Sequence, residues 1–205
     1  INDSFKNFQQ MKIKKLIILA MKTRFYLLIT ALMLIPFSMF AQTDHLKFKG
    51  VPIDGTLNQF VAKMQSAGFT KLRQDGKAVI LEGDFAGYKD CYILVSTLDN
   101  KDLVNQIAVK FSSHNNWRTL ENNYQSLKEL LTKKYGQPFD VQEEFQGRYI
   151  NDDNDRWHEL AMDRCIFRTE WRTELGKVIL AIGHERLEGG FVILGYVDKA
   201  NDAIV

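Results

Sequence analysis

The sequence predicts an α+β fold in which an antiparallel sheet carries two helices on one face. Two stretches have apolar residues at helical spacing, and each is followed by short runs of alternating or apolar residues with turn residues between them. The same helix-then-meander unit thus occurs twice. Because helices placed between hairpin-linked strands pack on a face of the sheet, we expect both units in a single domain over residues 42–205.

The first helix is predicted over residues 56–67. Thr56 and Gln59 have the spacing of a capping box, in which each side chain bonds the other residue's free backbone N–H. Gly68 can take the left-handed conformation that ends a helix. One buried face is indicated by the spacing of Leu57, Phe60, Val61 and Met64.

The second helix is predicted over residues 117–135. Asn116 is the expected N-cap, and Gly136 with Pro138 ends the helix. A regular apolar stripe, typical of a core-facing helix, consists of Trp117, Leu120, Tyr124, Leu127, Leu131 and Tyr135.

Strands are predicted where residues alternate or where apolar runs lie between turn residues. They cover residues 45–50, 78–85, 90–97, 103–111, 163–172, 177–184 and 191–198. The connection over residues 139–159 is the most polar part of the chain, and we interpret it as a solvated acidic loop.

An export signal is predicted over residues 21–41. A basic start, Met21–Arg24, is followed by an apolar stretch over residues 25–40 and by a small residue, after which charge returns. This order is typical of a cleavable secretory signal, and the stretch is shorter than the about 20 residues of a membrane span. Residues 1–20 are treated as an upstream extension. We therefore expect a periplasmic or secreted protein with no stable membrane span after cleavage.

The charge balance changes once the signal is removed. Residues 1–41 contain six of the 27 Lys and Arg and one of the 25 Asp and Glu, so the remainder has 21 basic and 24 acidic residues, a net charge of −3. Such a chain is not expected to bind nucleic acid, which selects clustered positive charge. A lipoprotein is not expected either, because no cysteine precedes Cys91.

Two cysteines lie on predicted strands. Cys91 is in phase with Ile93, and Cys165 is in phase with Phe167 and Trp171, so both point to the buried side. An oxidising compartment favours a disulfide between Cys91 and Cys165 if their strands are neighbours. The alternative is a pair of buried free thiols.

Two groups of residues are candidates for a contact surface. Phe145, Tyr149 and Trp157 lie in the long polar connection, where aromatic side chains either tuck the loop against the body or anchor a partner. Three arginines share one face of a predicted strand, where they either receive a carboxylate-rich partner or pair with nearby acids such as Glu170. These arginines are Arg164, Arg168 and Arg172.

No pattern in the sequence predicts a catalytic residue, a cofactor or a metal ion. The four histidines are not at metal-ligand spacing, and neither a nucleophile elbow nor a glycine-rich phosphate loop occurs. Asp152, Asp153 and Asp155 lack the glycine and the distal glutamate of an EF-hand loop.

Three segments resemble small exported proteins of gut Bacteroidota whose function is uncharacterised. They are K-G-V-P-I-D-G-T at residues 49–56, G-D-F-A-G-Y-K-D-C at 83–91 and L-L-T-K-K-Y-G-Q-P at 130–138. The resemblance implies a single periplasmic or secreted domain and carries over no active-site residue. At the level of architecture, the repeated helix-plus-meander order is similar to the tandem fold of β-lactamase inhibitor proteins.

The function expected from these observations is that of a non-enzymatic binding or interaction module of the cell envelope, with an unknown protein or envelope ligand as its partner. Two alternatives remain. One is an inhibitor of a secreted enzyme, which depends on the architectural similarity alone. The other is a hydrolase that uses the acidic and histidine side chains of residues 152–159.

Overall fold

The computed structural model describes residues 44–147 and 150–204. The predicted signal peptide at residues 21–41 lies outside the described residues, as does Tyr149. The described residues belong to one compact unit.

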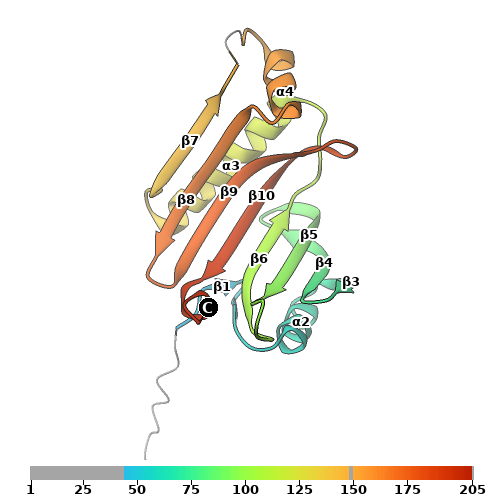
Figure 1. The fold of residues 1–205 in the computed structure, drawn as a ribbon, viewed down its shortest axis with the longest axis vertical. Helices are drawn as coiled ribbons and strands as arrows, with labels where there is room; N and C mark the ends of the chain where they lie inside the picture. The colour runs from blue at the N-terminus through green and yellow to red at the C-terminus, as the bar shows by residue number, and fades with distance from the viewer. Residues whose placement is uncertain (1–43, 148–149, 205) are drawn as a thin grey trace, which may run out of the picture. The chain divides into compact units, whose positions relative to one another are not determined.

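Eight antiparallel strands form one sheet in the order β3-β4-β5-β6-β10-β9-β8-β7 (Figure 1). In chain order they are β3 (Thr70–Asp75), β4 (Ala78–Phe85), β5 (Tyr88–Thr97), β6 (Val104–Lys110), β7 (Asp140–Phe145), β8 (Cys165–Thr173), β9 (Gly176–Glu185) and β10 (Gly189–Asp198). A small hairpin, β1 (Lys47–Phe48) and β2 (Val51–Pro52), precedes them. The predicted large antiparallel sheet in a mixed α and β fold is confirmed.

Four helices occur in the described part of the chain: α2 (Leu57–Ser66), α3 (Trp117–Tyr135), α4 (Asp153–Ala161) and α5 (Lys199–Asp202). The first half of the fold is α2 followed by β3 to β6, and the second half is α3 followed by β7, α4 and β8 to β10. The two halves meet where β6 pairs with β10, with Val109 opposite Leu194 and Ile107 opposite Tyr196.

The two long helices begin as their caps predict. Thr56 accepts a hydrogen bond from the backbone of Gln59, and the Gln59 side chain accepts one from the backbone of Thr56, which completes the capping box. Asn116 accepts from the backbone of Thr119 at 2.9 Å. Gly68 follows α2 with a positive φ, where glycine has no steric penalty.

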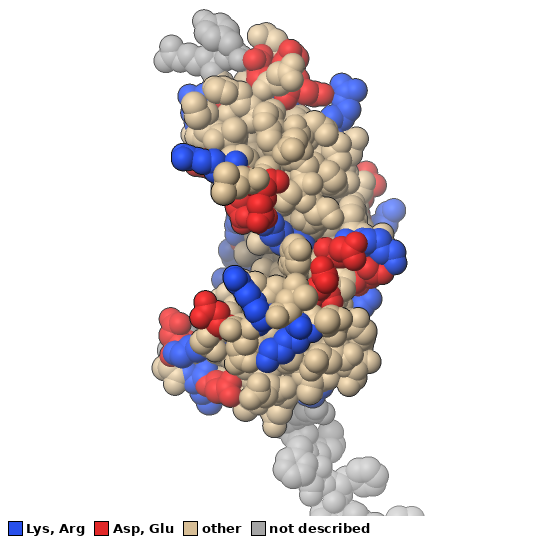
Figure 2. Space-filling view, turned by 90° about the vertical axis from the view of Figure 1, so that its right-hand side faces the viewer, with Lys and Arg blue, Asp and Glu red and all other residues tan. Residues whose placement is uncertain are grey.

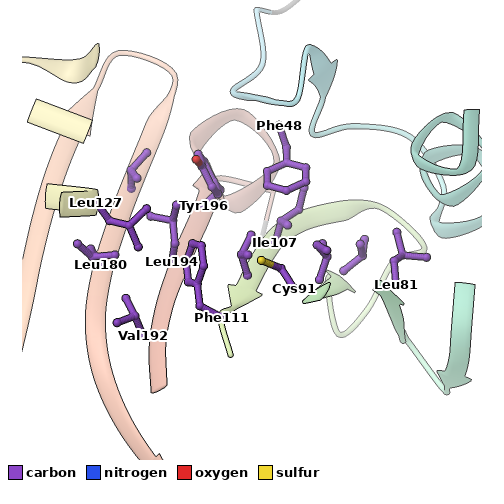
Figure 3. Close-up of a cluster of buried hydrophobic side chains, with 14 of the residues drawn as sticks. Phe48, Leu81, Cys91, Ile107, Phe111, Leu127, Leu180, Val192, Leu194 and Tyr196 are labelled. Atoms are coloured by element: carbon purple, nitrogen blue, oxygen red, sulfur yellow. The ribbon is translucent and has the colours of Figure 1, made fainter. Parts of the chain in front are cut away.

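One buried cluster of apolar side chains runs along the sheet through both halves. The cross-strand register places Val95, Ile107, Tyr196 and Val178 in one row, and all four are buried. Helix α2 packs against β3, β4 and β5, and α3 packs against β8, β9 and β10, behind which it lies in Figure 1. Figure 3 shows the cluster passing through Leu194 where the halves join.

The interpretation of residues 139–159 as a loop is wrong. The segment contains β7, which pairs with β8 at the edge of the sheet, and α4, which is capped by Asp152. Strand β3, at the opposite edge, was also not predicted. Both edge strands are mostly exposed and polar, so neither has the alternation by which an inner strand is recognised.

A buried polar group ties the start of the described chain to its end. The Asp198 carboxylate, which is fully buried, accepts hydrogen bonds from the backbone of Leu46 at 2.7 Å and of Asn201 at 3.0 Å, and it contacts the His45 ring at 3.0 Å. The Asn201 side chain donates to the carbonyl oxygens of Ile53 at 3.0 Å and Val104 at 2.9 Å. These contacts join β2, β6 and β10 through their ends.

The expected disulfide between Cys91 and Cys165 is wrong, and both cysteines are free. Cys91 lies on β5 and Cys165 on β8, with β6, β10 and β9 between them. Strands β5 and β8 are four strand spacings apart, or about 19 Å. A disulfide requires Cα atoms within about 7 Å of each other. Burial raises the pKa of the Cys91 thiol and raises the pKa of the Cys165 thiol to about 12.

The first prediction concerns the Asn201 contacts. Asn201→Ala leaves the buried carbonyls of Ile53 and Val104 without a donor, so the free energy of unfolding should fall by about 1–3 kcal/mol. Urea denaturation followed by circular dichroism measures the change. Asn58→Ala, at an exposed position of α2, is the control and should change stability by less than about 0.5 kcal/mol. Equal effects of the two substitutions would contradict the assignment.

The second prediction concerns the thiols. Alkylation of the denatured, unreduced protein should modify both Cys91 and Cys165, because the fold keeps them on strands that do not touch. Mass spectrometry counts the added groups. Alkylation that appears only after reduction would show a disulfide and contradict the strand order. Native protein should react much more slowly, since burial keeps both thiols protonated.

Candidate interaction surface

The sheet has a second face, formed by the residues between the buried ones. On β5, Cys91, Ile93 and Val95 are buried, whereas Tyr92 and Leu94 point to the other side and are 46% and 40% exposed. Apolar residues exposed on a strand at this density are unusual for a solvated sheet face. We call this second side the open face.

The open face remains apolar across several strands. Cross-strand partners of Leu94 are Ile80 on β4 and Ala108 on β6, and Ala108 in turn lies opposite Gly195 on β10. The next partner of Gly195 is Ile179 on β9. One row therefore carries only apolar residues or glycine over five strands, in both halves of the fold.

Small residues at the junction of the halves leave room above the sheet. Ala108 and Gly195 are partners on β6 and β10, and Ala181 lies opposite Ile193. A Cβ atom added at Gly195 would meet only the carbonyl oxygen of Ile179, at 3.8 Å. A hollow in the open face extends from β3 to this junction, which it reaches at Ala108 on β6 and Ile193 on β10.

The hollow has a volume of about 540 Å³. Its floor is formed by Ile80, Leu94, Ala108 and Ile193, and its sides include Leu72, Tyr92 and Phe191. Figure 2 turns the front of Figure 1 to the left, where the surface of the unit is recessed at mid-height between acidic and basic side chains. Volumes of a few hundred Å³ with apolar walls and few polar groups are typical of binding sites.

Charged side chains stand at the border of the hollow. Lys110 donates to Glu185 at 2.9 Å and to Glu188 at 2.6 Å, and its ammonium lies 4.5 Å from the centre of the Phe191 ring. Burial disfavours the charged form of Lys110, but the two carboxylates outweigh burial and raise its pKa. The Lys110 ammonium in turn lowers the pKa of Glu188. Lys110 and Glu188 thus each favour the charged form of the other.

The structure places two of the three predicted arginines, Arg168 and Arg172, in an ion-pair cluster. Glu170, which is buried, accepts from Arg172 at 2.6 Å and also from Arg168, and Arg168 reaches Asp140 at 3.3 Å. The Arg172 guanidinium stacks on the Phe139 ring at 3.5 Å. Hydrogen bonds from Arg172 and Arg168 outweigh burial and lower the pKa of Glu170. The ion-pairing alternative is therefore the one that this part of the sheet shows.

Two predicted aromatic contact residues, Phe145 and Trp157, pack against the body of the fold. Phe145 packs against Trp117 and Phe167, with ring centres 4.9 and 5.3 Å away. Trp157 lies edge-on to His184. Arg164 precedes β8 and donates to the buried Glu159 at 2.7 Å, so it does not join Arg168 and Arg172.

The acidic residues of the segment 152–159 have structural partners. Asp152 caps α4, and Asp153 pairs with Arg118 and Arg156. His158 is exposed, and no hydrogen bond joins it to these acids in the described residues. A group of three or more potential metal ligands does not occur in residues 44–147 and 150–204. Within the same ranges, no helix has the length and apolar character needed to cross a membrane.

The sequence contained a signal for the open face that alternation alone does not capture. Residues 92–95 and 191–194 are continuous apolar runs, typical of strands buried on both faces. The buried cluster to which the helices contribute contains Ile93 and Val95, and it leaves Tyr92 and Leu94 outside.

Comparison with family models, with curated proteins and with solved structures gives no match to this chain.

The third prediction concerns Glu170 and pH. Because the folded-state pKa of Glu170 is lowered, its ionisation contributes stability above the ordinary carboxyl pKa, and this contribution is lost as pH falls through the folded-state value. Glu170→Gln should lower the free energy of unfolding by about 1–2 kcal/mol at pH 7. The difference from the unmodified protein should shrink below about pH 4.

Denaturant unfolding from pH 2 to 7 measures this difference. Glu174→Gln, at an exposed turn position, is the matched control and should leave stability unchanged at every pH. A gap between Glu170→Gln and the unmodified protein that is constant with pH would contradict the ion-pair cluster as its source.

Proposed function

We propose that this chain is an exported, non-enzymatic binding module that contacts a partner through the hollow in its open face. The observation that carries the proposal is an apolar row that continues across the junction of the halves, in which Leu94 is exposed and the other members are half-buried. The row consists of Ile80, Leu94, Ala108, Gly195 and Ile179, and its first three members line the hollow. Exposed apolar surface bordered by charged residues is the usual composition of a protein-binding site.

Energetics favour occupation of this surface. Hydration of the exposed parts of Leu72, Tyr92 and Leu94 is unfavourable, and burial of apolar area contributes about 25 cal/mol per Å². The charged border favours one orientation of the partner. In any other orientation, charged groups at the interface would lose water without gaining a group of opposite charge. Both features favour a binding role over a catalytic one.

Export is part of the proposal. It is supported by the order of residues 21–41 and by the resemblance of the chain to small exported proteins. Mass spectrometry of the protein purified from the cell envelope or the medium should give an N-terminus close to residue 42. Recovery from the cytoplasm with residues 21–41 still attached would overturn export.

The fourth prediction tests the binding surface. A photo-crosslinking amino acid at Leu94 should give a discrete covalent adduct in cells. The same amino acid at Leu130, on the exposed side of α3 and 45% exposed, is the matched control and should give none. Addition of Ile193→Arg to the Leu94 variant should abolish the adduct, because the charge lies on the floor of the hollow.

The test compares the covalent adducts formed at Leu94 and at Leu130. An adduct at Leu94 that resists Ile193→Arg, or equal adducts at Leu94 and Leu130, would overturn the hollow as the contact site. Near-ultraviolet circular dichroism of the Ile193→Arg variant separates lost binding from lost folding.

A further inference from the structure

The two sides of the hollow carry opposite charge. On one side, Glu185 and Glu188 share the single ammonium of Lys110 through one oxygen atom each, and their side chains are 50% and 58% exposed. This side therefore keeps one excess negative charge and carboxylate oxygens that can accept further hydrogen bonds. A basic group of a ligand fits here.

The opposite side carries Arg73, on edge strand β3. Its side chain lines the hollow and is exposed, and no salt bridge to it occurs among the described residues. A guanidinium of this kind is suited to a carboxylate, which it can hold through two parallel hydrogen bonds. An acidic group of a ligand fits here.

The distance between the two sides limits the length of the ligand. The Glu185 and Glu188 carboxylates meet the Lys110 ammonium on β6, and β3 lies three strand spacings from β6, or about 14 Å. Lys110 is also two residues further along its strand than Ala108, which shares the row of Arg73, so an extended segment of about five to seven residues can bridge the two sides diagonally. The floor between them is apolar, which requires apolar side chains on the face of the segment that meets Leu94 and Ile193.

We infer that the occupant of the hollow is a segment of a partner protein with a basic residue at one end, apolar residues in the middle and an acidic residue at the other end. This inference rests on the proposed binding function and adds the chemistry of the partner. A concave surface favours a protruding protein segment over a lipid bilayer, because a flat membrane would leave the recessed floor uncovered (Figure 2).

The probe is the capped heptapeptide Lys-Ser-Leu-Ser-Leu-Ser-Glu, in which the leucines share one face of an extended chain. Matched peptides carry Gln at both ends, Lys at both ends or Glu at both ends. Titration into labelled protein, followed by amide NMR shifts, gives both the location and the dissociation constant. The Lys/Glu peptide should shift the amides of Tyr92, Leu94 and Ile193 and should bind at least about threefold more tightly than the Gln peptide.

Protein variants test each side of the hollow. Arg73→Glu makes both sides acidic, so the Lys/Lys peptide should become the tightest ligand and the Lys/Glu peptide should weaken. Glu188→Gln should weaken the Lys/Glu peptide about twofold or more. The controls are Lys133→Glu on α3 and Glu174→Gln in the turn before β9, which should change neither preference.

Each outcome has a defined meaning. Equal affinity of the charged and neutral peptides, or an unchanged preference in Arg73→Glu, overturns the inferred chemistry. Vesicles of phosphatidylcholine and phosphatidylglycerol that shift the same amides while the peptides do not would also overturn it. If the Leu94 crosslink still depends on Ile193 in any of these cases, the binding function stands and only the partner's chemistry is wrong.

Discussion

The pairing of β6 with β10 is the constraint on which the rest of the structure depends. These strands are the last in each half, and their antiparallel register, Val109 against Leu194, turns two four-stranded meanders into one sheet. The buried apolar cluster then continues from one half into the other. The same pairing places Lys110 opposite Ile193, so the junction that unites the core also brings residues of both halves into the lining of the hollow.

The two faces of the sheet differ in what covers them. Buried residues of α2 and α3 form one apolar cluster with inner-strand residues such as Ile93 and Leu194, whereas Leu94, Ile193 and Ile179 lie outside this cluster. Charged side chains stand at the border of this apolar area, where Lys110 pairs with Glu185 and Glu188, and they limit its extent. Such a border also opposes nonspecific association of exposed strands.

The sequence predicted those elements whose local signals agree with their burial. Helix α2 has a capping box and a regular apolar face, and inner strand β4 has the predicted bounds. Edge strands β3 and β7 were missed because polar, exposed strands lack alternation. Neighbours in the sheet depend on long-range pairing, so Cys91 and Cys165 could be assigned to the buried side but not to strands far apart. The open face was missed because its residues come from strands that only the fold brings together.

The buried Asp198 has a consequence for the connectivity of the molecule. Through His45 and Leu46 it holds the beginning of the folded unit against the segment that ends it, so the chain forms a nearly closed ring. When the two ends of a folded unit lie together, they can be joined and the chain opened in another loop without a change in packing. A short linker between these ends, with a new opening in the connection before α3, would give a circular permutant that presents the second half first and retains every strand pair of the sheet.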